Sequence, residues 1–256
     1  MAAHLGDETR AAVFEALLRL GDDRLVLGHR LSEWCGHAPI LEEDIALANI
    51  ALDLIGQAAL LLKLAGDVEG RGRSEDDLAY FREAIGFRNA LLCELPKGDF
   101  AFTVMRQFLW GTYGVFHLER LQTSSHAELA GIAAKALKET RYHVRHCGEW
   151  VVKLGDGTDE SRRRAQAALN ELWRYTGELF LDDEIERDAA AVVPGPAATE
   201  GRWRAQVDDV LRRATLTVPE APYMQRGGRQ GRHTEHLGHL LAEMQILARS
   251  YPGAQW

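Results

Sequence analysis

The sequence predicts an all-α protein, built as a four-helix bundle with additional flanking helices. Its seven prolines leave long proline-free segments, and apolar residues recur in them every three to four positions, as on one face of a helix. No segment shows the strict polar and apolar alternation of a half-buried strand. Four of the predicted helices are long, which favours a bundle.

Start and stop signals separate several of these helices. Gly21-Asp22-Asp23 is expected to divide the first helix from the second, and Ser74 is a predicted N-cap. The segment "GDGT" at 155–158 is expected to end one helix and cap the next. The predicted ranges are 8–20, 22–36, 40–66, 74–85, 99–124, 126–154, 158–182, 199–217 and 233–250.

The chain is expected to form one helical domain, residues 1–256. Its 46% hydrophobic content is enough to bury a large core. Only the segment 189–201, "AAAVVPGPAATEG", resembles a linker, and the stretch of chain after it is too short for an independent core.

Charge and cysteine usage narrow the classes of protein. The net charge of −8 argues against a nucleic-acid partner, which would require clustered Lys and Arg. Cys35, Cys93 and Cys147 lie far apart in the chain, which indicates reduced thiols rather than disulfides or a zinc ribbon. We therefore expect a soluble, cytoplasmic protein.

A membrane partner is not expected either. The most apolar stretch is residues 45–65. Polar residues interrupt it, which argues against a membrane span; they are Asn49, Asp53, Gln57 and Lys63.

The stretch "LKETRYHVRH" at 137–146 raises the question of a di-iron site. Ferritin-like bundles hold two irons with a Glu-x-x-His pair from each of two helices and a carboxylate from each of the other two. No Asp or Glu in this chain has a His three positions later. On the inward stripe of helix 126–154 the ligand-spaced pair is Thr140 and His143, with Glu139 at the edge.

The other three bundle helices offer equally few ligands. In helix 40–66 the pair at ligand spacing is Asp53 and Gly56, and helix 99–124 has no carboxylate in its middle. Helix 22–36 retains Glu33. We expect Glu33, Asp53 and His143 to lie in the interior as a hydrogen-bonded polar cluster, which His29 could join, rather than to hold metal.

Several stretches together resemble a known family. They are "LVLGHRLSEWCGHAPILEEDIALANIALDLIGQA", "KALKETRYHVRHCGEWVVKLGDGTDE", "ALNELWRYTGELF", "GRHTEHLGHLLAEMQ" and the final "PGAQW". On these the chain resembles the structural, non-catalytic subunits of bacterial phenylacetyl-CoA 1,2-epoxidases. The likeness covers most of the sequence.

The resemblance implies a ferritin-like fold and a role in an oxygenase complex. In that family a homologous catalytic subunit carries the di-iron centre, small accessory subunits and a reductase with flavin and an iron–sulfur cluster complete the complex, and NADPH and oxygen are consumed. It also implies that Glu33 is a retained carboxylate position, that Asp53 and Gly56 are a lost Glu-x-x-His, and that Thr140 and His143 are a half-lost one. This chain would then hold no cofactor of its own.

An alternative is a self-sufficient di-iron oxygenase or an iron-storage-like protein with an unrecognised ligand set. The missing Glu-x-x-His pairs favour the structural subunit over this alternative.

Two motifs near the C-terminus invite other interpretations. "HTEHLGH" resembles a metal site but matches no known zinc spacing, so a surface histidine cluster is favoured; its candidate ligands are His233, Glu235, His236, His239 and Glu243. "QRGGRQGRH" contains Arg226, Arg229 and Arg232. These arginines could bind the phosphates of CoA or an acidic partner, or they could form a solvated loop.

Apolar residues on more than one side of two helices predict a partner chain. Helix 99–124 is rich in aromatic residues, and helix 40–66 is apolar nearly all round. We expect a second subunit to cover both, and a homodimer is possible when the chain is alone.

Overall fold

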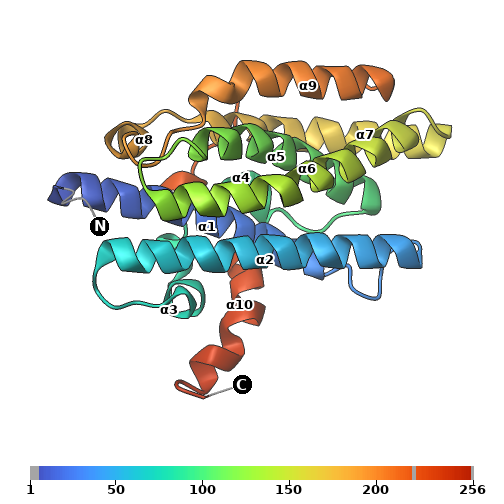
Figure 1. The fold of residues 1–256 in the computed structure, drawn as a ribbon. Helices are drawn as coiled ribbons and strands as arrows, with labels where there is room; N and C mark the ends of the chain where they lie inside the picture. The colour runs from blue at the N-terminus through green and yellow to red at the C-terminus, as the bar shows by residue number, and fades with distance from the viewer. Residues whose placement is uncertain (1–5, 221–222, 255–256) are drawn as a thin grey trace.

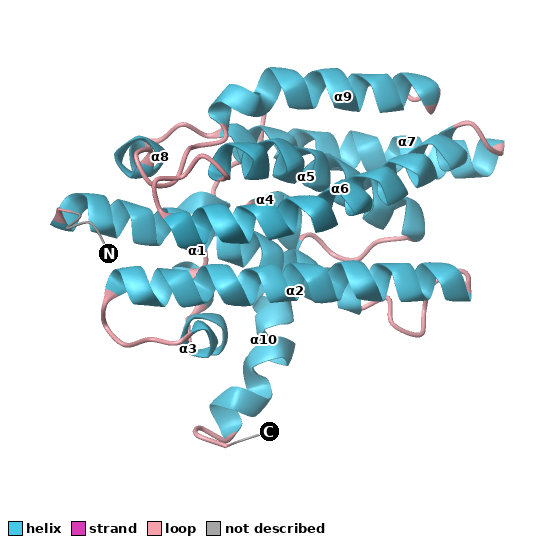
Figure 2. Cartoon of the chain, viewed as in Figure 1, coloured by secondary structure: helices cyan, strands magenta, loops and turns pink. Residues whose placement is uncertain are grey.

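The computed structural model describes residues 6–220 and 223–254, and within these ranges it contains helices and no strand, which confirms the all-α class (Figures 1 and 2). The last two residues of the "PGAQW" motif lie outside the described part. Four long helices form the bundle: α1 (Asp7–Ser32), α2 (Leu41–Glu69), α5 (Phe100–Leu121) and α6 (Ala127–Gly155). The flanking helices are α3 (Glu75–Tyr80), α4 (Leu91–Glu94), α7 (Asp159–Leu172), α8 (Glu184–Ala189), α9 (Glu200–Arg213) and α10 (Glu235–Ser250).

The bundle consists of two packed helix pairs. α1 lies along α2, and α5 lies along α6, while α7 and α9 cover the outer side of α5 (Figure 1). The aromatic side chains of α5 are consequently buried or partly buried inside this chain. The expectation that α5 needs a partner subunit to cover its aromatics is therefore wrong.

α1 is continuous through Gly21-Asp22-Asp23, so the predicted break there is wrong. A Cβ at position 21 would lie 2.7 Å from Leu62 Cδ2, which shows that glycine allows α1 and α2 to approach closely. Asp22 and Asp23 are buried and pair with Arg82 and Arg229, respectively. Residues that usually end helices are here retained by tertiary ion pairs.

The predicted caps are confirmed. Ser74 and Asp77 form a capping box at the start of α3, and Thr158 and Ser161 form one at the start of α7. Two predicted helices are shorter than expected: α3 ends at Tyr80, and α7 ends at Leu172, where the chain continues as 3₁₀ turns over Trp173–Phe180. The short helices α4 and α8 were not predicted.

One hydrophobic core extends through the described chain, from Ala12 to Leu241. The proline-containing segment that resembled a linker contributes Val192 and Val193 to this core. It is a packed connection between α8 and α9.

α2 lies on the opposite side of the bundle from α9 (Figure 1), and part of its apolar surface is exposed, including Ile45 and Leu52. By length and hydropathy alone α2 could cross a membrane, so its polar residues do not exclude a span as expected. It also packs along α1, with 44% of its most apolar stretch buried, and core helices of globular proteins pass the same test. The composition of α2 alone therefore does not distinguish a membrane span from a core helix of a globular protein.

Candidate functional site

Two of the polar residues predicted for the bundle interior, Asp53 and His143, meet between α2 and α6. His143 Nε2 lies 2.9 Å from Asp53 Oδ2. The imidazole is fully buried, whereas 39% of the Asp53 side chain is exposed. Burial lowers the pKa of His143 more than the Asp53 carboxylate raises it, so the ring is neutral near pH 7. A neutral ring that donates Nε2–H to Asp53 leaves Nδ1 without a partner among the described residues.

Thr140 lies one turn before His143 and is also fully buried, as predicted. Its hydroxyl donates to the Ala136 carbonyl at 2.8 Å. This bond within the helix occupies the hydroxyl proton and leaves no anionic oxygen at the position. The pair Thr140 and His143 thus faces inward but supplies one imidazole only.

Gly56 is exposed, so its predicted inward placement is wrong. A Cβ at this position would meet no atom within 4 Å. The next residue, Gln57, faces the interior instead and is buried. Helical periodicity misplaced Gly56 because α2 is apolar on nearly every side, which leaves its inward direction poorly defined.

Gln57 connects an arginine of α1 to a carboxylate of α6. Its Oε1 accepts from Arg24 Nε at 3.0 Å, and its Nε2 donates to Glu139 Oε2 at 2.8 Å. Arg24 is fully buried, donates to the Leu20 carbonyl and lies over the Trp110 ring. Burial lowers the pKa of Arg24, but the guanidinium keeps its charge at neutral pH because the ordinary value is so high.

Glu33 does not join this cluster, so its predicted interior position is wrong. It follows the last residue of α1, with 36% of its side chain exposed, and pairs with Arg30 at 2.7 Å. His29 is partly buried, and its Nε2, which solvent does not reach, has no partner in the described ranges. The polar side chain that α1 contributes between the helices, in contact with Gln57, is Arg24.

This set of residues does not fit a di-iron centre. The guanidinium of Arg24 is buried between the helices, and it would repel a cation held beside it. On α5, glycines bring the backbone against α6: a Cβ at Gly111 would lie 3.0 Å from Val144, and one at Gly114 would lie 3.4 Å from Thr140. The hollow beside Arg24 has no space for a water molecule. Within the described residues no group of three or more His, Cys, Asp or Glu could hold a metal ion.

Arg229, one of the three loop arginines, is a buried structural residue. Both its terminal nitrogens lie 2.9 Å from the Asp23 carboxylate, and it also donates to the Arg88 carbonyl. Burial lowers the pKa of Arg229, but Asp23 more than offsets this and raises it above the ordinary value. Arg229 is therefore not free to bind CoA. Arg226 and Arg232 are at least partly exposed.

The histidine motif is also mainly structural. His233 Nδ1 lies 2.7 Å from Glu94 Oε2, and both side chains are buried, so His233 is no surface histidine. The backbone carbonyl of His236 accepts from Arg30, while His239 and Glu243 are exposed on α10. The motif attaches the start of α10 to the bundle.

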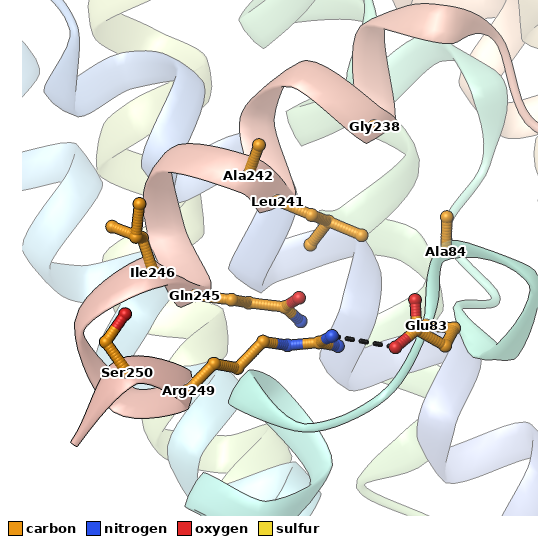
Figure 3. Close-up of a pocket in the computed structure, with 9 residues that line it drawn as sticks. All are labelled: Glu83, Ala84, Gly238, Leu241, Ala242, Gln245, Ile246, Arg249 and Ser250. Atoms are coloured by element: carbon orange, nitrogen blue, oxygen red, sulfur yellow. Dashed lines mark hydrogen bonds and ion pairs between the residues drawn. The ribbon is translucent and has the colours of Figure 1, made fainter. Parts of the chain in front are cut away.

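A surface hollow lies between α10 and the segment at Glu83 and Ala84 (Figure 3). Arg249 points across it to Glu83 and pairs with it at 2.7 Å, and Gln245 donates to two backbone carbonyls of the same segment. The polar groups that line it are thus engaged in holding α10.

Fold and interior together define a class: a ferritin-like helical bundle whose interior polar residues are an arginine, a glutamine, a threonine and an Asp–His pair rather than a set of metal ligands. Comparison with known sequences gives the particular family. The chain belongs to the phenylacetic acid catabolic protein family, whose sequence profile matches residues 1–256. It is 48% identical over 241 residues to a subunit of the 1,2-phenylacetyl-CoA epoxidase of Escherichia coli K12, across 93% of this chain and 97% of that protein. The resemblance to subunits of phenylacetyl-CoA epoxidases is confirmed.

Proposed function

We propose that this chain is a structural, non-catalytic subunit of a complex that epoxidises phenylacetyl-CoA, and that it pairs with a homologous catalytic subunit. The observation that supports this proposal most directly is Arg24. Its buried guanidinium, tied through Gln57 to Glu139, lies among the residues where a ferritin-like oxygenase would hold its irons. Similarity to an epoxidase subunit over nearly the full length supports the assignment to the complex.

The remaining components belong to the same proposal. This chain carries no cofactor, the catalytic partner carries the di-iron centre, and a reductase with flavin and an iron–sulfur cluster delivers electrons from NADPH. Small accessory subunits complete the assembly in the cytoplasm. A self-sufficient oxygenase or iron-storage protein is disfavoured because it would require cation ligands where Arg24 lies.

Reconstitution tests this role. The chain alone should not epoxidise phenylacetyl-CoA in the presence of reductase and NADPH, whereas the mixture with the catalytic subunit should. Arg24→Met and His143→Gln change the interior of this chain, and the turnover per assembled complex should stay within about twofold of wild type. A loss of about tenfold or more in turnover of a complex that still assembles would show that these residues take part in catalysis.

A further inference from the structure

The uncovered side of α2 carries exposed residues at alternating spacings of four and three. They form the α2 seam, which consists of Ile45, Asn49, Leu52, Gly56 and Ala59. Ile45 and Leu52 are large apolar residues with 54% and 67% of their surface exposed.

This spacing is that of helices packed side by side. Residues that alternate at three and four positions stay on one face and insert between the side chains of a neighbouring helix. Gly56 and Ala59 allow a second helix to come close, and no atom lies within 4 Å of a Cβ placed at Gly56. The geometry of the seam therefore suits a helix rather than a small molecule.

The size of the seam requires more than an isolated helix as its occupant. The stretch from Leu41 to Lys63 is roughly 34 Å long at 1.5 Å per residue, and a helix about 10 Å wide covers roughly 340 Å² of it. A stable interface takes about 800 Å² from each partner. The contact must extend onto α6, where Tyr142 is exposed and stacks on His146. A folded bundle can make such a contact.

A second copy of this chain fits the seam poorly. Two copies paired over the whole seam, centred on Leu52, bring their Asp53 residues close together whether the helices run parallel or antiparallel. Each carboxylate is already partly exposed and bound to His143. Two Asp53 carboxylates that face each other in an interface from which water is excluded would repel each other. A non-identical partner can place a donor opposite Asp53 and another opposite the Asn49 amide.

We infer that the α2 seam is the docking surface for a helix of the homologous catalytic subunit, which presents hydrogen-bond donors or a basic side chain opposite Asp53. The inference rests on the proposed function for the identity of the partner. It gives Gly56 a role as a point of close helix contact.

Gly56→Leu tests the inference without disturbing the free chain, because the new side chain has open space. Gly201→Leu is the matched control: Gly201 is also an exposed glycine within a helix, α9, with no atom within 4 Å of a Cβ, and α9 lies on the opposite side of the bundle from α2 (Figure 1). Gly56→Leu should weaken binding to the catalytic subunit by about 30-fold or more, as expected at an interface centre. Gly201→Leu should change it less than about threefold. Calorimetric titration gives the affinity, and thermal unfolding of each free variant verifies the fold.

Leu52→Lys provides a second variant, since this exposed side chain makes the change tolerable in the free protein, and it should weaken binding to a similar degree. If the wild type binds the catalytic subunit and both variants bind equally well, the seam is not the docking surface, although the proposed function stands. If the wild type does not bind the catalytic subunit at all, the proposed function fails. If the wild type instead dimerises with itself and Gly56→Leu abolishes that dimer, the assignment of the partner is overturned.

Discussion

The buried Arg24 limits what the interior beside it can bind. Arg24 donates to Gln57 and Leu20 and lies over Trp110 inside the bundle. The carboxylate of Glu139 balances this positive charge without touching Arg24. The Gln57 side chain lies between the two residues and is hydrogen-bonded to both. A cation could bind beside Gln57 only if the Arg24 side chain moved out of the interior.

The Asp53–His143 contact should contribute to folding. His143→Ala should lower the free energy of unfolding by about 1–3 kcal/mol, because it removes a buried hydrogen-bonding group. Asp53→Ala should cost less, since that carboxylate is partly exposed. Urea unfolding of both variants measures this, with Glu149→Ala, an exposed residue of α6, expected within about 0.5 kcal/mol of wild type. A neutral result for His143→Ala would contradict the contact.

His117 should make stability dependent on pH. It is buried, with Nε2 near the Pro194 carbonyl and Nδ1 near the Tyr113 hydroxyl, and burial lowers its pKa to about 3. The folded protein therefore favours the neutral ring. This contribution is fully present above about pH 6.5 and is lost as the pH falls from there towards about 3, by about 1.4 kcal/mol per pH unit.

Comparison of unfolding free energies between about pH 7 and about pH 5 tests the neutral state of His117. His117→Gln should have a shallower pH dependence than wild type, whereas His239→Gln, on the exposed side of α10, should match wild type. Equal slopes for wild type and His117→Gln would show that the imidazole is not held neutral.

At the scale of elements, α1 makes tertiary contacts on two of its sides. Gly21 lets it pack tightly on α2, while Asp22 and Asp23 on another side bind Arg82 and Arg229. These ion pairs fix irregular segments near residues 82–90 and 225–234 against the helix. The loop that looked solvated in the sequence is therefore attached to the bundle through Arg229.

Arg229→Ala should consequently destabilise the fold. It leaves the buried Asp23 carboxylate without its counter-charge, which typically costs about 3–5 kcal/mol. Arg226→Ala, at an exposed position in the same loop, should change stability by less than about 0.5 kcal/mol. Thermal unfolding distinguishes them. Similar effects for both variants would contradict the buried ion pair. Only Arg226 and Arg232 are suitable for testing whether the loop contacts CoA.

Periodicity predicted some elements well and others poorly, for physical reasons. The apolar stripe of α6 is one-sided, so the inward placement of Thr140 and His143 could be predicted. α2 is apolar nearly all round, and there the choice of Gly56 over Gln57 failed. Arg24 was missed because a charged residue in a helix usually faces solvent. Its only signal was a location within the apolar stretch "RLVLGHRL".

At the scale of the whole molecule, the chain combines a filled interior with an uncovered α2 seam. The hollow beside Arg24 has no space for a water molecule, and large apolar side chains of α2 are exposed. Both features agree with the proposed subunit that supports a catalytic relative. We expect the bundle itself to bind no iron.

The most direct test is the iron content of the isolated full-length chain, produced in iron-supplemented medium and measured by mass spectrometry of the metal against protein concentration. The catalytic subunit, treated in the same way, is the positive control. We expect far less than one iron per chain for wild type. About two irons per chain, retained through gel filtration, would contradict this expectation and establish a metal site that Arg24 does not exclude.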